Sequence, residues 1–243
     1  MHATLGTHEF QIPLMYFVGR SKRANYGKDG WRLAVLWPNM TPWRKNNPED
    51  DKEFHALDGG RTIKITITPA GNYKPHFLLN RLIEEYDSPN DPGYSSRKLS
   101  FIDDPYPRSV RLTADIIYGL QPYYLDINKV LPFWNRIRNS GHPPLTAHDL
   151  RTENTGVDWF VKRDAKGVAT TLVRCPTKEM TDDPAEFKRA GAVVLIPQCG
   201  HKIMLPAYGL LADIDYKRIY LPHWQEIENV VRALLMQFEI KKP

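Results

Sequence analysis

Cys199 and His201 lie two positions apart and are the pair whose residue types could carry chemistry. A thiolate beside an imidazole base is the usual arrangement of a cysteine nucleophile. If a strand continued past Gly200, both side chains would point to the same face, but the glycine is expected to break that alternation. A nucleophilic cysteine also tends to sit at a helix N-terminus or near a positive charge, and no helix start follows Cys199. Catalysis by this pair is therefore the weakest of three interpretations.

The second cysteine, Cys175, supplies the preferred interpretation. It ends the predicted strand 168–175, while Cys199 ends the strand-like segment 192–199. The ends of two strands in one sheet can bring their Cα atoms to bridging distance. We therefore expect a Cys175–Cys199 disulfide, with two unrelated thiols as the remaining interpretation. Because disulfides persist in oxidising compartments, this pairing favours a location outside the cytoplasm.

Other catalytic and metal signatures are missing from the sequence. It contains no GxSxG elbow, Gly-rich phosphate loop, HExxH or CxxC motif. His55 is followed by Asp58, and His148 is followed by Asp149. A hydrolase with a His–acid pair therefore stays open as an alternative. The acidic run 49–53 lacks the alternating order of an EF-type calcium loop. We expect no metal site and no cofactor.

A proline-stiffened loop, 37–45, carries two tryptophans, a methionine and two cations. One interpretation is structural, with Trp43 packed over the edge of a sheet. The other is a contact surface, because Trp, Arg and Met are enriched at interfaces. We assign Trp43, Arg44 and Lys45 as the expected contacts with a protein partner.

Charge and composition exclude some function classes. The formal net charge is +5, and the basic residues are spread along the chain without a block of like charges. Nucleic-acid binders usually concentrate basic residues in a stripe or an arm, so no nucleic-acid partner is expected. Binding of another polyanion stays a second alternative. No apolar run of about 18 residues is present that would predict a transmembrane helix.

The pattern of elements predicts an α+β protein, with a mainly antiparallel sheet and a few helices. The segment 61–68 is the clearest strand, since its isoleucines alternate with Lys and Thr. The turn 164–167 predicts a β-hairpin between 157–163 and 168–175. Further strands are predicted at 31–37, 110–120, 192–199, 201–206 and 208–218.

Helices are predicted at 72–86, 182–191 and 221–240, and 126–139 is expected to hold either a helix or two short turns, since Pro132 interrupts it. The helix 221–240 is an amphipathic helix packed on the sheet. Its apolar stripe consists of Trp224, Ile227, Val231, Leu234, Leu235 and Phe238. Long proline-rich loops, 37–60 and 86–107, separate the elements. We expect one domain over 1–243, with a division into two halves, 1–140 and 150–243, left open.

Three stretches resemble immunity proteins of bacterial type VI secretion systems, especially those that neutralise periplasmic phospholipase (lipase) effectors. The start, 9–20, looks like the entry of a mature protein after a removed leader or lipoprotein signal. Next, 30–43 looks like a strand running into a "W-P-x-M/F-x-P" loop. Finally, the order Cys175, Cys199-x-His201 and 215–238 resembles a strand with a "Y-x-R" element followed by a "L-x-x-W-x-x-I" helix.

The resemblance implies a periplasmic protein without enzymatic activity that binds and inhibits one secreted antibacterial effector, lipase-like in class. The sequence starts at Met1 without a signal peptide, so the resemblance implies a leader that is absent from this sequence. Membrane anchoring would then come through a removed N-terminal lipoprotein signal. The segment 70–150 carries none of the resemblance.

Overall fold

The computed structural model describes most of the chain outside its longest connections. The described residues are 2–5, 7–17, 30–44, 46–55, 60–70, 79–80, 82–83, 108–137, 143–147, 149, 157–176 and 197–240. The predicted helix 182–191, the loop 86–107 and most of the predicted helix 72–86 lie outside these residues.

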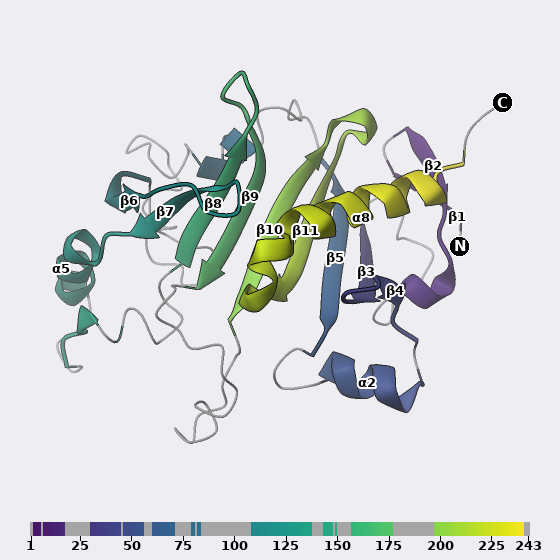
Figure 1. Ribbon diagram of the computed structural model, residues 1–243, viewed down its shortest axis with the longest axis horizontal. Helices are drawn as coiled ribbons and strands as arrows, with labels where there is room; N and C mark the ends of the chain where they lie inside the picture. The colour runs from purple at the N-terminus through teal and green to yellow at the C-terminus, as the bar shows by residue number, and fades with distance from the viewer. Residues whose placement is uncertain are drawn as a thin grey trace.

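Within the described part of the chain, the main element is a nine-stranded antiparallel sheet, in the order β4-β3-β5-β11-β10-β9-β8-β7-β6 (Figure 1). A two-stranded sheet pairs β1 with β2. The strands are β1 (His2–Leu5), β2 (His8–Gln11), β3 (Trp31–Leu36), β4 (Thr41–Pro42), β5 (Thr62–Pro69), β6 (Arg111–Thr113), β7 (Gln121–Leu125), β8 (Val157–Arg163), β9 (Ala169–Pro176), β10 (Gln198–Leu205) and β11 (Leu210–Lys217).

Helices are few, so the α+β class is confirmed. The α-helices with described bounds are α2 (Pro48–His55), α5 (Ile127–Ile137) and α8 (Trp224–Phe238). Short 3-10 helices are η1 (Leu14–Tyr16), η3 (Arg108–Val110), η4 (Pro206–Tyr208) and η5 (Arg218–His223).

The C-terminal helix α8 crosses one face of the sheet over β10, β11 and β5 (Figure 1). All six apolar residues predicted for its buried stripe are buried. They join the largest apolar cluster, which includes the alternating isoleucines of β5, Ile63, Ile65 and Ile67. Burial of such side chains contributes about 1.5–3 kcal/mol each, so this stripe fixes α8 on the sheet.

The centre of the sheet is buried on both faces. Successive strand residues point to opposite faces. Phe160 packs into the cluster beneath α8, whereas its neighbours Trp159 and Val161 belong to a second cluster with Leu79 and Ile83. The strands that carry Cys175 and His201 therefore run through the interior.

Three expectations about the elements need correction. The strand β10 runs without a break through Gly200, where the sequence predicted an interruption. The predicted strand 110–120 is the short β6 followed by a tight turn that leads into β7. The loop 37–60 contains the helix α2, whose first turn is capped by Asn47: its Oδ1 accepts hydrogen bonds from the backbone N–H groups of Glu49 (3.0 Å) and Asp50 (3.2 Å).

Candidate functional site

The two cysteines form a disulfide between neighbouring strands β9 and β10. Gly200 is paired with Arg174, so the next residues in that antiparallel register, Cys199 and Cys175, face each other. Their Cα atoms are 4.2 Å apart and both residues are fully buried. The pairing expected from the sequence is therefore present, although Cys199 lies near the start of a strand and not at its end. A bonded sulfur has no thiolate, which removes the nucleophile required by the Cys199/His201 hydrolase alternative.

His201 lies on the same face of β10 as Cys199, because the strand continues through Gly200. Its side chain is fully buried under α8, between the rings of Tyr216 and Trp224. The Nδ1 atom is 3.3 Å from the Tyr216 hydroxyl oxygen. Burial lowers the pKa of His201 and burial raises that of Tyr216. An imidazole held neutral and out of reach of solvent cannot serve an external substrate.

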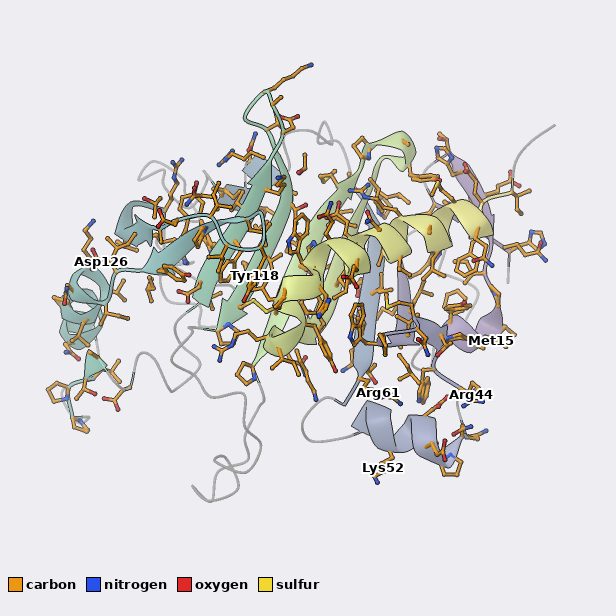
Figure 2. All side chains as sticks on the ribbon, in the orientation of Figure 1. Met15, Arg44, Lys52, Arg61, Tyr118 and Asp126 are labelled. Carbon is orange, nitrogen blue, oxygen red and sulfur yellow. A yellow bond between two sulfur atoms is a disulfide. The ribbon has the colours of Figure 1, made fainter. Side chains whose placement is uncertain are left out.

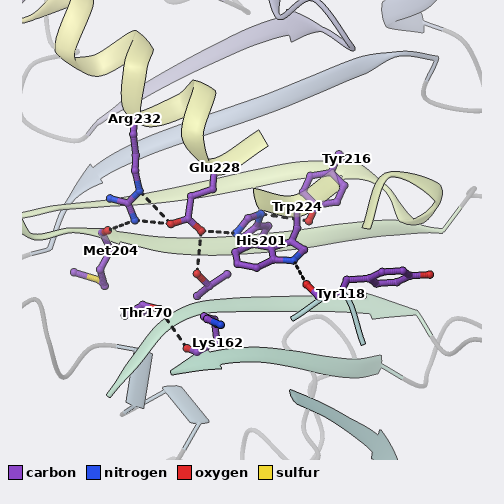
Figure 3. Close-up of polar contacts among 10 residues, drawn as sticks. Tyr118, Lys162, Thr170, His201, Met204, Tyr216, Trp224, Glu228 and Arg232 are labelled. Atoms are coloured by element: carbon purple, nitrogen blue, oxygen red, sulfur yellow. Dashed lines mark hydrogen bonds and ion pairs between the residues drawn. The ribbon is translucent and has the colours of Figure 1, made fainter. Parts of the chain in front are cut away.

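Glu228 of α8 connects the helix to this interior (Figure 3). Its Oε1 accepts two hydrogen bonds from Arg232, from Nη2 at 2.6 Å and from Nε at 3.1 Å. Its Oε2 accepts one from the Thr171 hydroxyl at 2.9 Å and lies 3.6 Å from Nε2 of His201. Arg232 also donates to the backbone carbonyl of Met204. These contacts tie α8 to β9 and β10.

The pKa of Glu228 reflects competing causes. Burial raises the pKa, but the interactions with His201 and Arg232 outweigh burial and leave the pKa below its ordinary value. A buried carboxylate that is charged and paired in this way is a structural group. We call Thr171, His201, Tyr216, Glu228 and Arg232 the interior polar cluster, and we assign it to holding α8 in place.

A different surface surrounds the residues predicted to contact a partner. Trp43 is only 7% exposed and so packs into the protein, as in the structural interpretation of the loop. Arg44 is exposed, and Lys45 lies outside the described residues. The contact prediction therefore depends on Arg44 among the residues that the structure describes.

Arg44 is fixed by Asp50 in α2. The Arg44 Nε donates to Oδ2 at 2.9 Å, Nη2 donates to Oδ1 at 3.2 Å, and the backbone N–H donates to Oδ2 at 2.9 Å. Hydrogen bonds from Arg44 hold the pKa of Asp50 below its ordinary value, despite the burial of that carboxylate. This pair joins the segment after β4 to α2 and sets the position of the guanidinium.

A surface pocket of about 430 Å³ opens beside this pair. Most of its lining side chains are polar or charged, and they come from the end of β3 and the turn after it, from β4 and the residues that follow it, from α2 and from the residue before β5. The lining residues are Leu36, Trp37, Asn39, Thr41, Arg44, Glu49, Asp50, Lys52 and Arg61. We call this the Arg44 pocket.

The other sites considered in the sequence give nothing further. The side chain of His55 and all of His148 lie outside the described residues, so the His–acid alternatives stay open. Over the described ranges, no group of three or more His, Cys, Asp or Glu side chains is arranged to hold a metal ion. In the same ranges no helix is long and apolar enough to cross a bilayer.

The sequence analysis did not identify Glu228 and Arg232, which lie near the buried His201. It also did not identify Lys52 and Arg61, which line the Arg44 pocket. Glu228 and Arg232 carried a signal, since they are an i, i+4 acid–base pair beside an apolar stripe. Lys52 and Arg61 carried none, because no periodic pattern or motif marks them as residues of one pocket.

The fold has a counterpart among solved structures. An immunity protein of the type IV secretion system of Stenotrophomonas maltophilia superposes with a TM-score of 0.70 at 23% sequence identity. The match covers 99% of this chain and 93% of that protein. The two proteins share one fold. No family model matches the chain, and no curated protein matches it significantly.

That neighbour belongs to the protein class named by the resemblance but to a different secretion system. It is an immunity protein, as the resemblance implied, but it belongs to a type IV and not a type VI system. Its description names no lipase. At this identity the likeness shows a shared fold, and the role, the secretion system and the class of effector are left to proposal.

Proposed function

We propose that this protein is an immunity protein, which binds and neutralises a cognate antibacterial effector of a bacterial secretion system. The observation that carries the proposal is the shared fold, over 99% of the chain, with a secretion-system immunity protein. The buried Cys175–Cys199 disulfide and the fully buried His201 support it, because they leave this pair without an exposed nucleophile or base. The protein then acts by binding, without catalysis of its own.

The compartment proposed for this action is the periplasm. Disulfides form and persist in the bacterial periplasm and are rare in the cytosol. The disulfide is buried between two central strands, so its formation and the packing of the sheet are coupled. Anchoring through a lipoprotein signal belongs to the same proposal.

A protection assay tests the function. Susceptible cells export the effector encoded beside the gene for this protein, and they carry this chain either with a periplasmic leader or without one. Survival only with the exported form is the expected result. Equal killing in all arms, with the chain folded and present in the periplasm, would exclude the immunity function. Protection by the form without a leader would exclude the periplasm as the site of action.

The finer proposal is that the effector is a lipase. It follows from the resemblance of 9–20, 30–43 and 215–238 to immunity proteins of periplasmic phospholipase effectors. The test measures the release of fatty acid from phospholipid vesicles by the purified effector. We expect release by the effector alone and no release once this protein is added. If this protein neutralises an effector that releases no fatty acid, the effector is not a lipase, and the proposed immunity function still stands.

A further inference from the structure

Three cationic residues line the Arg44 pocket. Arg44 follows β4, Lys52 belongs to α2 and Arg61 precedes β5 (Figure 2). All three residues are exposed. We propose that this pocket binds an acidic loop of the effector, with carboxylates of that loop against Lys52 and Arg61. The inference depends on the proposed immunity function and names the surface that performs it.

The charges in the pocket favour an anionic group. Two acidic residues line it, but Asp50 is only 4% exposed and its oxygens accept three hydrogen bonds from Arg44. Its negative charge is therefore directed into the protein. The lining as a whole carries three cations, Arg44, Lys52 and Arg61, against the two acids Glu49 and Asp50, so its formal charge is +1. An incoming carboxylate thus meets an excess of positive charge, which favours encounter with an acidic partner.

The pocket is held in shape before any partner arrives. Asn47 caps α2, and the Arg44–Asp50 pair fixes that helix to the end of β4. A preorganised surface loses less conformational entropy on binding than a flexible one. The guanidinium of Arg44 keeps donor groups beyond those used by Asp50, because it carries five N–H bonds.

Aromatic side chains extend the surface beyond the pocket. Trp37 lines the pocket and is half-buried, and its ring contacts Tyr220 at 5.7 Å and His223 at 5.3 Å between centroids. Ile219, next to Tyr220 in η5, is 47% exposed. Trp, Tyr and Arg are the residues most enriched at interface hot spots. The cationic pocket and this aromatic margin together suit a protein surface.

A small molecule fits these features less well. Pockets for small molecules are lined predominantly by apolar and aromatic side chains with few polar groups. Here Leu36 and Trp37 are the apolar members, and the other lining residues are polar or charged. A surface that binds an acidic loop needs more polar than apolar side chains, with several hydrogen-bond donors and a small apolar contact.

The test measures affinity of the purified, disulfide-bonded protein for the effector by calorimetry, at about 50 mM and about 500 mM salt. The variant Lys52→Glu/Arg61→Glu reverses two exposed charges and replaces neither Arg44 nor Asp50. The variant Lys52→Gln/Arg61→Gln removes the same charges with less perturbation of folding. The control Lys162→Glu/Lys166→Glu makes an equal charge change on the β8–β9 hairpin, at the other side of the sheet.

We expect the charge reversal to weaken binding by about 100-fold at low salt, since each lost charge contact weakens binding about tenfold. The neutral variant should weaken it less and lose most of the salt dependence, and the control should stay within about threefold of the wild type. If the wild type binds the effector and the charge-reversal variant binds it with an affinity within about threefold of the wild type, the pocket is not the binding surface. The immunity function would then still stand. Equal weakening by the control would also exclude the pocket as the binding surface, in favour of general attraction to a polyanion. No wild-type binding would instead contradict the proposed function.

Discussion

Glu228 of α8 lies 3.6 Å from His201 of β10, measured from Oε2 to Nε2, and the histidine has no exposed surface. The pair joins the helix to the middle of the sheet. Burial lowers the pKa of His201, so the folded state holds a neutral imidazole. The interactions with His201 and Arg232 lower the pKa of Glu228 against the effect of burial.

Stability should therefore fall on acidification. A group with a lowered folded pKa contributes stability that is present above its unfolded pKa and lost below it. For His201 the loss starts near pH 6.5, the ordinary histidine pKa, and amounts to at most about 1.4 kcal/mol per pH unit. Glu228 adds to the loss at lower pH, once its unfolded form takes up protons. Urea unfolding between pH 7.5 and about 5 measures this slope.

The variants His201→Gln and His223→Gln separate the buried histidine from an exposed one. His223 is in η5, outside the interior polar cluster, with a side chain 47% exposed. We expect His201→Gln to flatten the slope between pH 7 and 5, and His223→Gln to preserve it. Identical slopes in wild type and His201→Gln would assign the pH dependence to other groups.

Neutralising the carboxylate of α8 should loosen the helix. Glu228→Gln leaves Arg232 without its charged acceptor in a half-buried position, which we expect to cost about 2 kcal/mol of unfolding free energy. The matched control is Glu226→Gln, whose side chain is 67% exposed and should change stability by less than about 0.5 kcal/mol. Chemical denaturation of both variants compares them directly. A cost equal to that of the control would show that the hydrogen bonds of Glu228 contribute nothing net.

The disulfide should stabilise the folded protein by lowering the conformational entropy of the unfolded chain. Cys175 and Cys199 are separated by 24 positions, and closing a loop of this length contributes about 3 kcal/mol in the entropy model. The double variant Cys175→Ala/Cys199→Ala should lose about that much. Reductant should then destabilise the wild type and leave the variant unchanged. A wild type indifferent to reductant would contradict the pairing.

Substitution by alanine is expected to change stability in opposite directions at Gly30 and Gly200. Gly30 precedes β3 with φ of +112°, and an added Cβ would lie 2.3 Å from the carbonyl oxygen of Ile67. We expect Gly30→Ala to lower the unfolding free energy by more than about 2 kcal/mol. Gly200 lies inside β10, and the nearest atom to an added Cβ would be Asp215 Oδ1, at an ordinary contact distance of 3.9 Å. Gly200→Ala should therefore raise stability by about 0.5–1 kcal/mol, the usual cost of glycine within a strand. Thermal unfolding of both checks the contrast, and a destabilising Gly200→Ala would contradict the space found at that residue.

The elements with strong periodicity could be predicted from the sequence. The stripe from Trp224 to Phe238 and the alternation of Ile63, Ile65 and Ile67 each follow one repeat of burial, which a linear pattern reveals. The disulfide was predictable for a similar reason, because the sequence offers only one pairing of its two cysteines.

The remaining features depend on tertiary context. Gly200 favours a strand break by propensity, but pairing with Arg174 on one side and Asp215 on the other keeps β10 continuous. The helix α2 has a charged, weakly amphipathic sequence, so its cap at Asn47 and its link to Arg44 were not evident from periodicity. The Arg44 pocket is lined by residues within 36–61, but its shape depends on the pairing of β3 with β5 and on the position of α2, which a linear pattern does not reveal.

The most direct test of the central claim is a titration of the purified effector with this protein in its disulfide-bonded form. The account predicts saturable binding at a fixed stoichiometry, with a Kd in the nanomolar range or below, and loss of effector activity in proportion to the complex formed. An effector that stays fully active at a large excess of folded, disulfide-bonded protein, with no binding heat at two temperatures, would contradict the account.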